Sequence, residues 1–66
     1  MNVKINDTAI ELPTGATLAE ALELRDIKTQ GIAVAVNNQV VAKGCYESHT
    51  LQEGDSVIII KAFYGG

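Results

Sequence analysis

The chain has 66 residues, of which 47% are hydrophobic, and a formal net charge of −3. This length predicts one small domain, and the apolar content is sufficient for a globular core. The acidic balance argues against nucleic acid and anionic membranes as partners. Cys45 is the single cysteine and His49 the single histidine, which excludes a disulfide framework and any metal site rich in either residue. Because no secretory signal or membrane-length apolar run is present, we expect a soluble cytoplasmic protein.

The first part of the chain predicts a β-hairpin. Residues 3–5 and 10–12 alternate apolar and polar side chains, which is the period of a half-buried strand. Asn6 and Asp7 lie between them, and both residue types tolerate left-handed backbone in turns. Pro13 ends the second strand because proline cannot donate to a ladder. The residues expected to face inward are Val3, Ile5, Ile10 and Leu12.

A short amphipathic helix is predicted to begin at Leu18. Thr17 precedes it and Glu20 follows three residues after Thr17, which is the spacing of a capping box. Leu18, Ala21 and Leu22 fall at i, i+3 and i+4 and form one apolar stripe. The helix should have about two turns, and a helix this short needs a sheet to pack on.

Three further strands are predicted after the helix. Residues 32–36 form a continuous apolar run, and residues 37–38 are an Asn-Asn pair suited to a tight hairpin turn. The chain returns over residues 40–42, and residues 56–61 are its most strongly β-forming stretch. Residues 43–51 are expected to form a loop or a short helical turn. The element order is therefore ββαβββ, an α+β arrangement in which one helix covers one face of a sheet.

This arrangement leaves apolar side chains on the uncovered face. The third and last strands are apolar at nearly every position, and such strands are usually buried on both faces. If Val34, Val36, Val57 and Ile59 face the helix, the opposite face carries Ala33, Ala35, Ile58 and Ile60. We expect these four residues to form a docking patch for a partner protein. The alternatives are that a loop folds over them or that they are scattered surface residues.

No catalytic constellation can be assembled from the sequence. Cys45 and His49 lie four residues apart with no third group to orient them, so an inert thiol beside a surface imidazole is favoured over a nucleophilic pair. The glycines are scattered and form no phosphate-binding loop. We therefore expect a protein that is not itself an enzyme and binds no metal or cofactor of its own.

Several segments together resemble the ThiS family, the ubiquitin-like β-grasp sulfur carrier proteins of thiamine biosynthesis. Residues 11–18 look like the family's second strand and helix start, residues 32–37 like its third strand and turn, and residues 51–57 like its L-x-x-G-D-x-(I/V) entry to the last strand. Gly65 and Gly66 match its terminal diglycine. Where many members carry proline, arginine and then tryptophan after the fourth strand, this chain carries Ala42, Lys43 and Tyr46. The resemblance covers essentially the whole length and implies one mixed sheet, with a β-grasp domain over 1–61 and a flexible tail over 62–66.

The resemblance also implies a carrier cycle. A ThiF-type adenylating enzyme would use ATP to activate the Gly66 carboxylate. Sulfur supplied through a cysteine desulfurase would convert it to a thiocarboxylate, and a ThiG-type thiazole synthase would take that sulfur.

The tail itself suits this cycle. An extended segment over 62–66 reaches about 16 Å, enough to enter a partner's active site while the domain docks outside. Phe63, Tyr64 and Gly65 are then expected to lie in the partner's channel; alternatively, Phe63 and Tyr64 pack back on the domain.

Other functions remain open on the sequence. The same fold could serve as a plain interaction module in which the glycines have no role. A carrier like the small subunit of molybdopterin synthase shares the fold and diglycine, although its members tend to be longer and to carry prolines near the terminus. A protein-modifying tag of the ubiquitin type is a further possibility.

Overall fold

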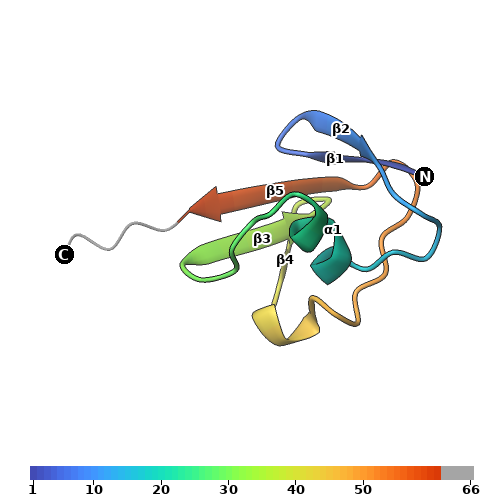
Figure 1. Cartoon of the computed structure of the whole chain (residues 1–66). Helices are drawn as coiled ribbons and strands as arrows, with labels where there is room; N and C mark the ends of the chain where they lie inside the picture. The colour runs from blue at the N-terminus through green and yellow to red at the C-terminus, as the bar shows by residue number, and fades with distance from the viewer. Residues whose placement is uncertain (62–66) are drawn as a thin grey trace.

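The computed structural model describes residues 1–61, which form a five-stranded sheet with one helix on one face (Figure 1). The predicted ββαβββ order is confirmed. In chain order the elements are β1 (Asn2–Ile5), β2 (Thr8–Glu11), α1 (Leu18–Leu24), β3 (Ile32–Val36), β4 (Gln39–Val41), the 3₁₀ helix η1 (Lys43–Cys45) and β5 (Ser56–Lys61). The predicted tail over 62–66 lies outside the described residues.

The sheet is mixed, as expected, and its strand order is β2-β1-β5-β3-β4. β5 is therefore central although it is the last strand of the chain. It pairs parallel with β1 and antiparallel with β3, whereas the two hairpin pairs, β1 with β2 and β3 with β4, are antiparallel. The strand that leads to the C-terminal segment is thus supported on both sides over its first residues.

Two-residue turns fix both hairpins. Asn6 and Asp7 have φ of 48° and 68°, and Asn37 and Asn38 have φ of 50° and 69°. Two successive positive φ values characterise the hairpin turn that matches strand twist, and asparagine and aspartate adopt them at low cost. Pairing begins immediately after each turn. β2 therefore begins at Thr8 and β4 at Gln39, whereas side-chain polarity alone predicted that these strands begin at residues 10 and 40.

The capping box at the start of α1 is present as predicted. The Thr17 hydroxyl oxygen accepts a hydrogen bond from the Glu20 backbone N–H at 3.3 Å, and the Glu20 carboxylate accepts from the Thr17 N–H at 3.4 Å. Two donors that a helix start leaves unpaired are thereby satisfied within four residues.

The segment that the sequence left unassigned completes the helix start. The carbonyl of His49 accepts from the N–H of Leu18 at 2.8 Å, and the carbonyl of Tyr46 accepts from the N–H of Ala19 at 2.9 Å. The Tyr46 side chain is also buried in the core. Residues 43–51 are therefore a structural support for α1, with η1 as the predicted short helical turn.

The end of α1 forms a Schellman motif built on aspartate. Asp26 has a φ of 56°, in the left-handed region where glycine is usual. The N–H of Ile27 donates to the carbonyl of Leu22 at 2.9 Å, and the N–H of Asp26 donates to that of Glu23 at 3.0 Å. Ile27 is partly buried against the core, so the turn also returns the chain to the sheet.

The core lies between α1 and one face of the sheet. Its buried residues are Val3, Ile5, Leu12, Ala16, Leu18, Ala21, Leu22, Val34, Val36, Tyr46, Leu51 and Val57, with Ile10 and Ile59 packed partly against them. The predicted inward residues of the strands and the apolar stripe of α1 are thus confirmed. Leu24, which flanks that stripe, remains 62% exposed.

Candidate functional site

The outer face of the sheet, opposite α1, carries a continuous apolar surface. The β3–β5 register places Ala33 opposite Ile60 and Ala35 opposite Ile58. All four residues lie on the face predicted from strand parity, because their neighbours Val34 and Val57 are fully buried on the other side. Ile60 is 54% exposed, so no segment within residues 1–61 folds over it.

Val40 extends this surface and was missed by the sequence reasoning. It pairs with Ala35 in the β3–β4 register and is 76% exposed, the largest value among the exposed large hydrophobic residues. The two-residue turn at 37–38 contained the necessary signal, since it fixes the pairing of Val36 with Gln39 and hence of Ala35 with Val40. We refer to Ala33, Ala35, Val40, Ile58 and Ile60 as the outer-face patch.

The rest of the outer face is mostly polar, with Ala9 as an exception. In β1, Lys4 pairs with Ala9 of β2 and with Ser56 of β5, and Asn2 pairs with Glu11. A shallow hollow in this region is lined by residues that include Asn2, Lys4, Asp7, Glu53 and Ser56. The outer face therefore consists of an apolar half over β5, β3 and β4 beside a polar half over β1 and β2.

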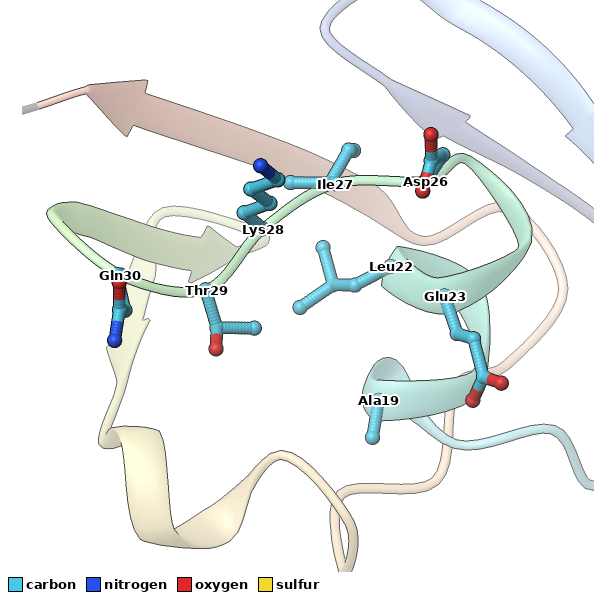
Figure 2. Close-up of a pocket in the computed structure, with 8 residues that line it drawn as sticks. All are labelled: Ala19, Leu22, Glu23, Asp26, Ile27, Lys28, Thr29 and Gln30. Carbon is cyan, nitrogen blue, oxygen red and sulfur yellow. The ribbon is translucent and has the colours of Figure 1, made fainter.

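A second hollow lies on the helix side of the sheet, between α1 and the segment that follows it. Figure 2 shows Leu22 of α1 pointing toward this segment, with Asp26 and Lys28 on the rim. Its lining also includes Ala19, Glu23, Ile27, Thr29 and Gln30, and contains no cysteine, histidine or serine. Asp26, which closes the Schellman turn, is one of the residues that line this hollow.

Cys45 and His49 are brought together only through the backbone. The N–H of His49 donates to the carbonyl of Cys45 at 2.9 Å, and the Cys45 side chain is exposed. Within residues 1–61, no group of three or more His, Cys, Asp or Glu side chains is arranged to hold a metal ion. None of the helices in that range has the length and apolar character needed to cross a membrane.

The other predicted site residues, Phe63, Tyr64, Gly65 and Gly66, lie outside the described residues. Their place in the chain is nevertheless informative. Ile58 and Ile60 belong to β5, and β5 ends at Lys61, immediately before the segment 62–66. Two residues of the outer-face patch, Ile58 and Ile60, therefore lie on the strand that immediately precedes residues 62–66 in the sequence; Figure 1 shows this strand, β5, in the centre of the sheet.

A mixed five-stranded sheet with its last strand in the centre and one helix across a single face defines the ubiquitin-like β-grasp class. Within that class, the family model of ThiS matches residues 2–66. The sulfur carrier protein ThiS of Escherichia coli (strain K12) is 33% identical over 66 residues, covering 100% of both chains. This chain belongs to the ThiS family.

Two solved structures have the same fold. A crystal structure of the thiamine biosynthesis protein ThiS from Geobacter metallireducens superposes with a TM-score of 0.86 at 20% identity, covering 100% of both chains. A solution structure of a thiamine biosynthesis protein from the same organism gives a TM-score of 0.73 at 22% identity, covering 100% of this chain and 87% of the other. At these identities the two comparisons support the fold.

Proposed function

We propose that this chain is a sulfur carrier protein of thiamine thiazole biosynthesis that carries sulfur on Gly66. A ThiF-type enzyme adenylates the Gly66 carboxylate with ATP, sulfur supplied through a cysteine desulfurase converts it to a thiocarboxylate, and a ThiG-type thiazole synthase receives the sulfur. The observation that carries this proposal is the match to the ThiS family over residues 2–66, which includes the Gly65-Gly66 pair.

The chemistry of the terminus suits this cycle. A carboxylate is a poor electrophile, so one of its oxygens first attacks the α-phosphorus of ATP and releases pyrophosphate. The resulting acyl-adenylate is open to attack by a sulfur nucleophile, and AMP leaves with the bonding electrons. Glycine at the last two positions lets the backbone approach the nucleotide closely, because no Cβ atom stands in the way.

The outer-face patch supplies the docking surface in this proposal. Because Ile58 and Ile60 lie at the end of β5, just before the C-terminal segment in the sequence, a partner that covers them is already beside the base of that segment. An extended segment of five residues reaches about 16 Å, which suffices to pass from a docked domain into an enzyme's active site. Phe63, Tyr64 and Gly65 are proposed to lie in the partner's channel.

The chain acts in this scheme as a protein cosubstrate and consumes no ATP by itself. Between Met1 and Lys61, the arrangement of Cys45 and His49 shows no oriented nucleophile and base. ATP belongs to the activating partner, and we propose no intrinsic cofactor.

The test is the intact mass of the protein after incubation with ATP, the ThiF-type enzyme and a sulfur source. We expect a mass increase equal to the replacement of one oxygen by sulfur, located at Gly66. Deleting Gly66, or adding one residue after it, should abolish the increase while leaving the fold unchanged. Binding to the partners without any mass change under conditions that modify a known carrier would favour a plain interaction module.

A further inference from the structure

Two asparagine side chains hold the central strand β5 from its two sides. The Oδ1 atom of Asn37 accepts a hydrogen bond from the N–H of Ser56 at 3.0 Å, and the Oδ1 atom of Asn6 accepts from the N–H of Ile59 at 2.9 Å. Each asparagine is the first residue of a two-residue hairpin turn, with φ of 50° for Asn37 and 48° for Asn6. The two residues therefore act alike, but at different places along β5.

Asn6 holds the part of β5 that β1 does not reach. The parallel pairing with β1 consists of Lys4 with Ser56 and Ile5 with Val57. The backbone N–H of Asn6 adds a bond to the carbonyl of Val57 at 2.9 Å, and its side chain then reaches two residues further, to Ile59. Within residues 1–61, this side-chain contact is the last hydrogen bond that the β5 backbone makes on its β1 side.

On the other side, β3 supports β5 to its end, since Ile32 pairs with Lys61. Without the Asn6 side chain, the last residues of β5 would therefore be held along one edge only. A strand held along one edge is freer to twist and fray, so the direction of the chain at Lys61 would be less well defined.

We infer that Asn6 is a positioning residue for the carrier reaction: by fixing β5 at Ile59, it sets the direction in which the C-terminal segment is presented to the activating enzyme. This inference rests on the proposed function. Its physical basis is preorganisation, because a terminus that already points toward the active site loses less freedom on reaching the reactive geometry.

Asn37 provides a matched control. Its side chain makes the same type of bond to β5 at Ser56, the end remote from the C-terminal segment, and its Nδ2 group also donates to Asp55 Oδ1 at 2.9 Å. Asn37→Gly and Asn6→Gly both keep the backbone N–H and suit a positive φ, and both remove the side-chain acceptor. Any general cost in stability is thus expected to be at least as large for Asn37→Gly.

The experiment measures two quantities in each variant: amide hydrogen exchange at Ile59, and the steady-state kinetics of ATP-dependent adenylation by the ThiF-type enzyme. We expect Asn6→Gly to speed exchange at Ile59 and to lower kcat about tenfold with KM changed less than about twofold, because no residue of the outer-face patch is substituted. Asn37→Gly should leave kcat within about twofold of wild type. Asn6→Asp, which keeps the acceptor, should restore most of the lost kcat.

Three results would overturn the inference: an unchanged kcat in Asn6→Gly, an equal loss of kcat in Asn37→Gly, or exchange at Ile59 that is the same in Asn6→Gly and wild type. A wild-type chain that is never adenylated would instead overturn the proposed function. The two failures are distinguishable. The two kcat comparisons require a wild-type chain that is adenylated, and the comparison of hydrogen exchange at Ile59 requires no adenylation.

Discussion

Ile60 of β5 lies directly opposite Ala33 of β3, with both side chains on the face of the sheet that α1 does not cover. A cross-strand pair of this kind normally contributes to a domain's own core. Here Ile60 remains 54% exposed, so about half of its surface is open to solvent within residues 1–61. If the outer-face patch is the docking surface, as proposed, substitutions in it should weaken binding without unfolding the domain.

Ile60→Glu should abolish or strongly weaken complex formation with the ThiF-type enzyme while the domain stays folded. A charge at the centre of an apolar contact must be desolvated on binding, and losing a central interface residue costs about 2 kcal/mol or more, a roughly 30-fold loss of affinity. Ile58→Glu should act in the same direction. The dissociation constant by calorimetry and the fold by circular dichroism are the two measurements.

Leu24→Glu is the matched control for this pair. Leu24 is a large aliphatic residue with 62% exposure, but it lies on α1, on the opposite side of the sheet. Its substitution should leave affinity unchanged. If Ile58→Glu or Ile60→Glu unfolds the domain, these side chains belong to the core and the docking role is wrong.

Val40→Glu tests how far the docking surface extends. Val40 is 76% exposed and joins Ile58 through their common neighbour Ala35, so we expect a smaller loss of affinity, about five- to tenfold, with no change in stability. An unchanged dissociation constant would confine the partner's footprint to β3 and β5. The dissociation constant of the Val40→Glu variant is measured by the same calorimetric titration as that of Ile60→Glu.

The sequence predicted the features of this fold that depend on local pattern. The odd and even positions along 32–36 and 56–61 placed Val34 and Ile60 on opposite faces, because side chains in a strand have a period of two. The spacing of Thr17 and Glu20 predicted the start of α1, because the capping box is complete within four residues.

Features that depend on contacts between distant segments were not predicted. The sequence did not reveal that Tyr46 enters the core or that its carbonyl caps Ala19, since the two residues are 27 positions apart and no periodic pattern links them. The hydrogen bond between Asn6 and Ile59 was missed for the same reason. A turn asparagine predicts a positive φ, but which strand its side chain reaches depends on the strand order.

Thr17→Ala should destabilise the domain by about 1 kcal/mol, because it removes the hydroxyl that accepts from the Glu20 N–H. For a domain of this size that loss lowers the melting temperature by about 4–8 °C. Thr17→Ser keeps the acceptor and should remain within about 0.5 kcal/mol of wild type. Thermal unfolding followed by circular dichroism distinguishes them, and equal melting temperatures for the alanine and serine variants would show that the hydroxyl contributes nothing.

Asp26→Gly should raise stability, and Asp26→Ala should lower it. Asp26 closes the Schellman motif with a φ of 56°, where a Cβ atom is unfavourable and glycine has no penalty. The gain is expected to be at most about 1 kcal/mol, because glycine also increases the entropy of the unfolded chain. Alanine keeps the Cβ atom and loses the polar side chain that helps aspartate tolerate this conformation, so the expected order of stability is glycine, aspartate, alanine.

Urea unfolding of the three proteins gives the order directly, and an alanine variant as stable as the glycine variant would mean that backbone strain at Asp26 does not limit the stability of this turn.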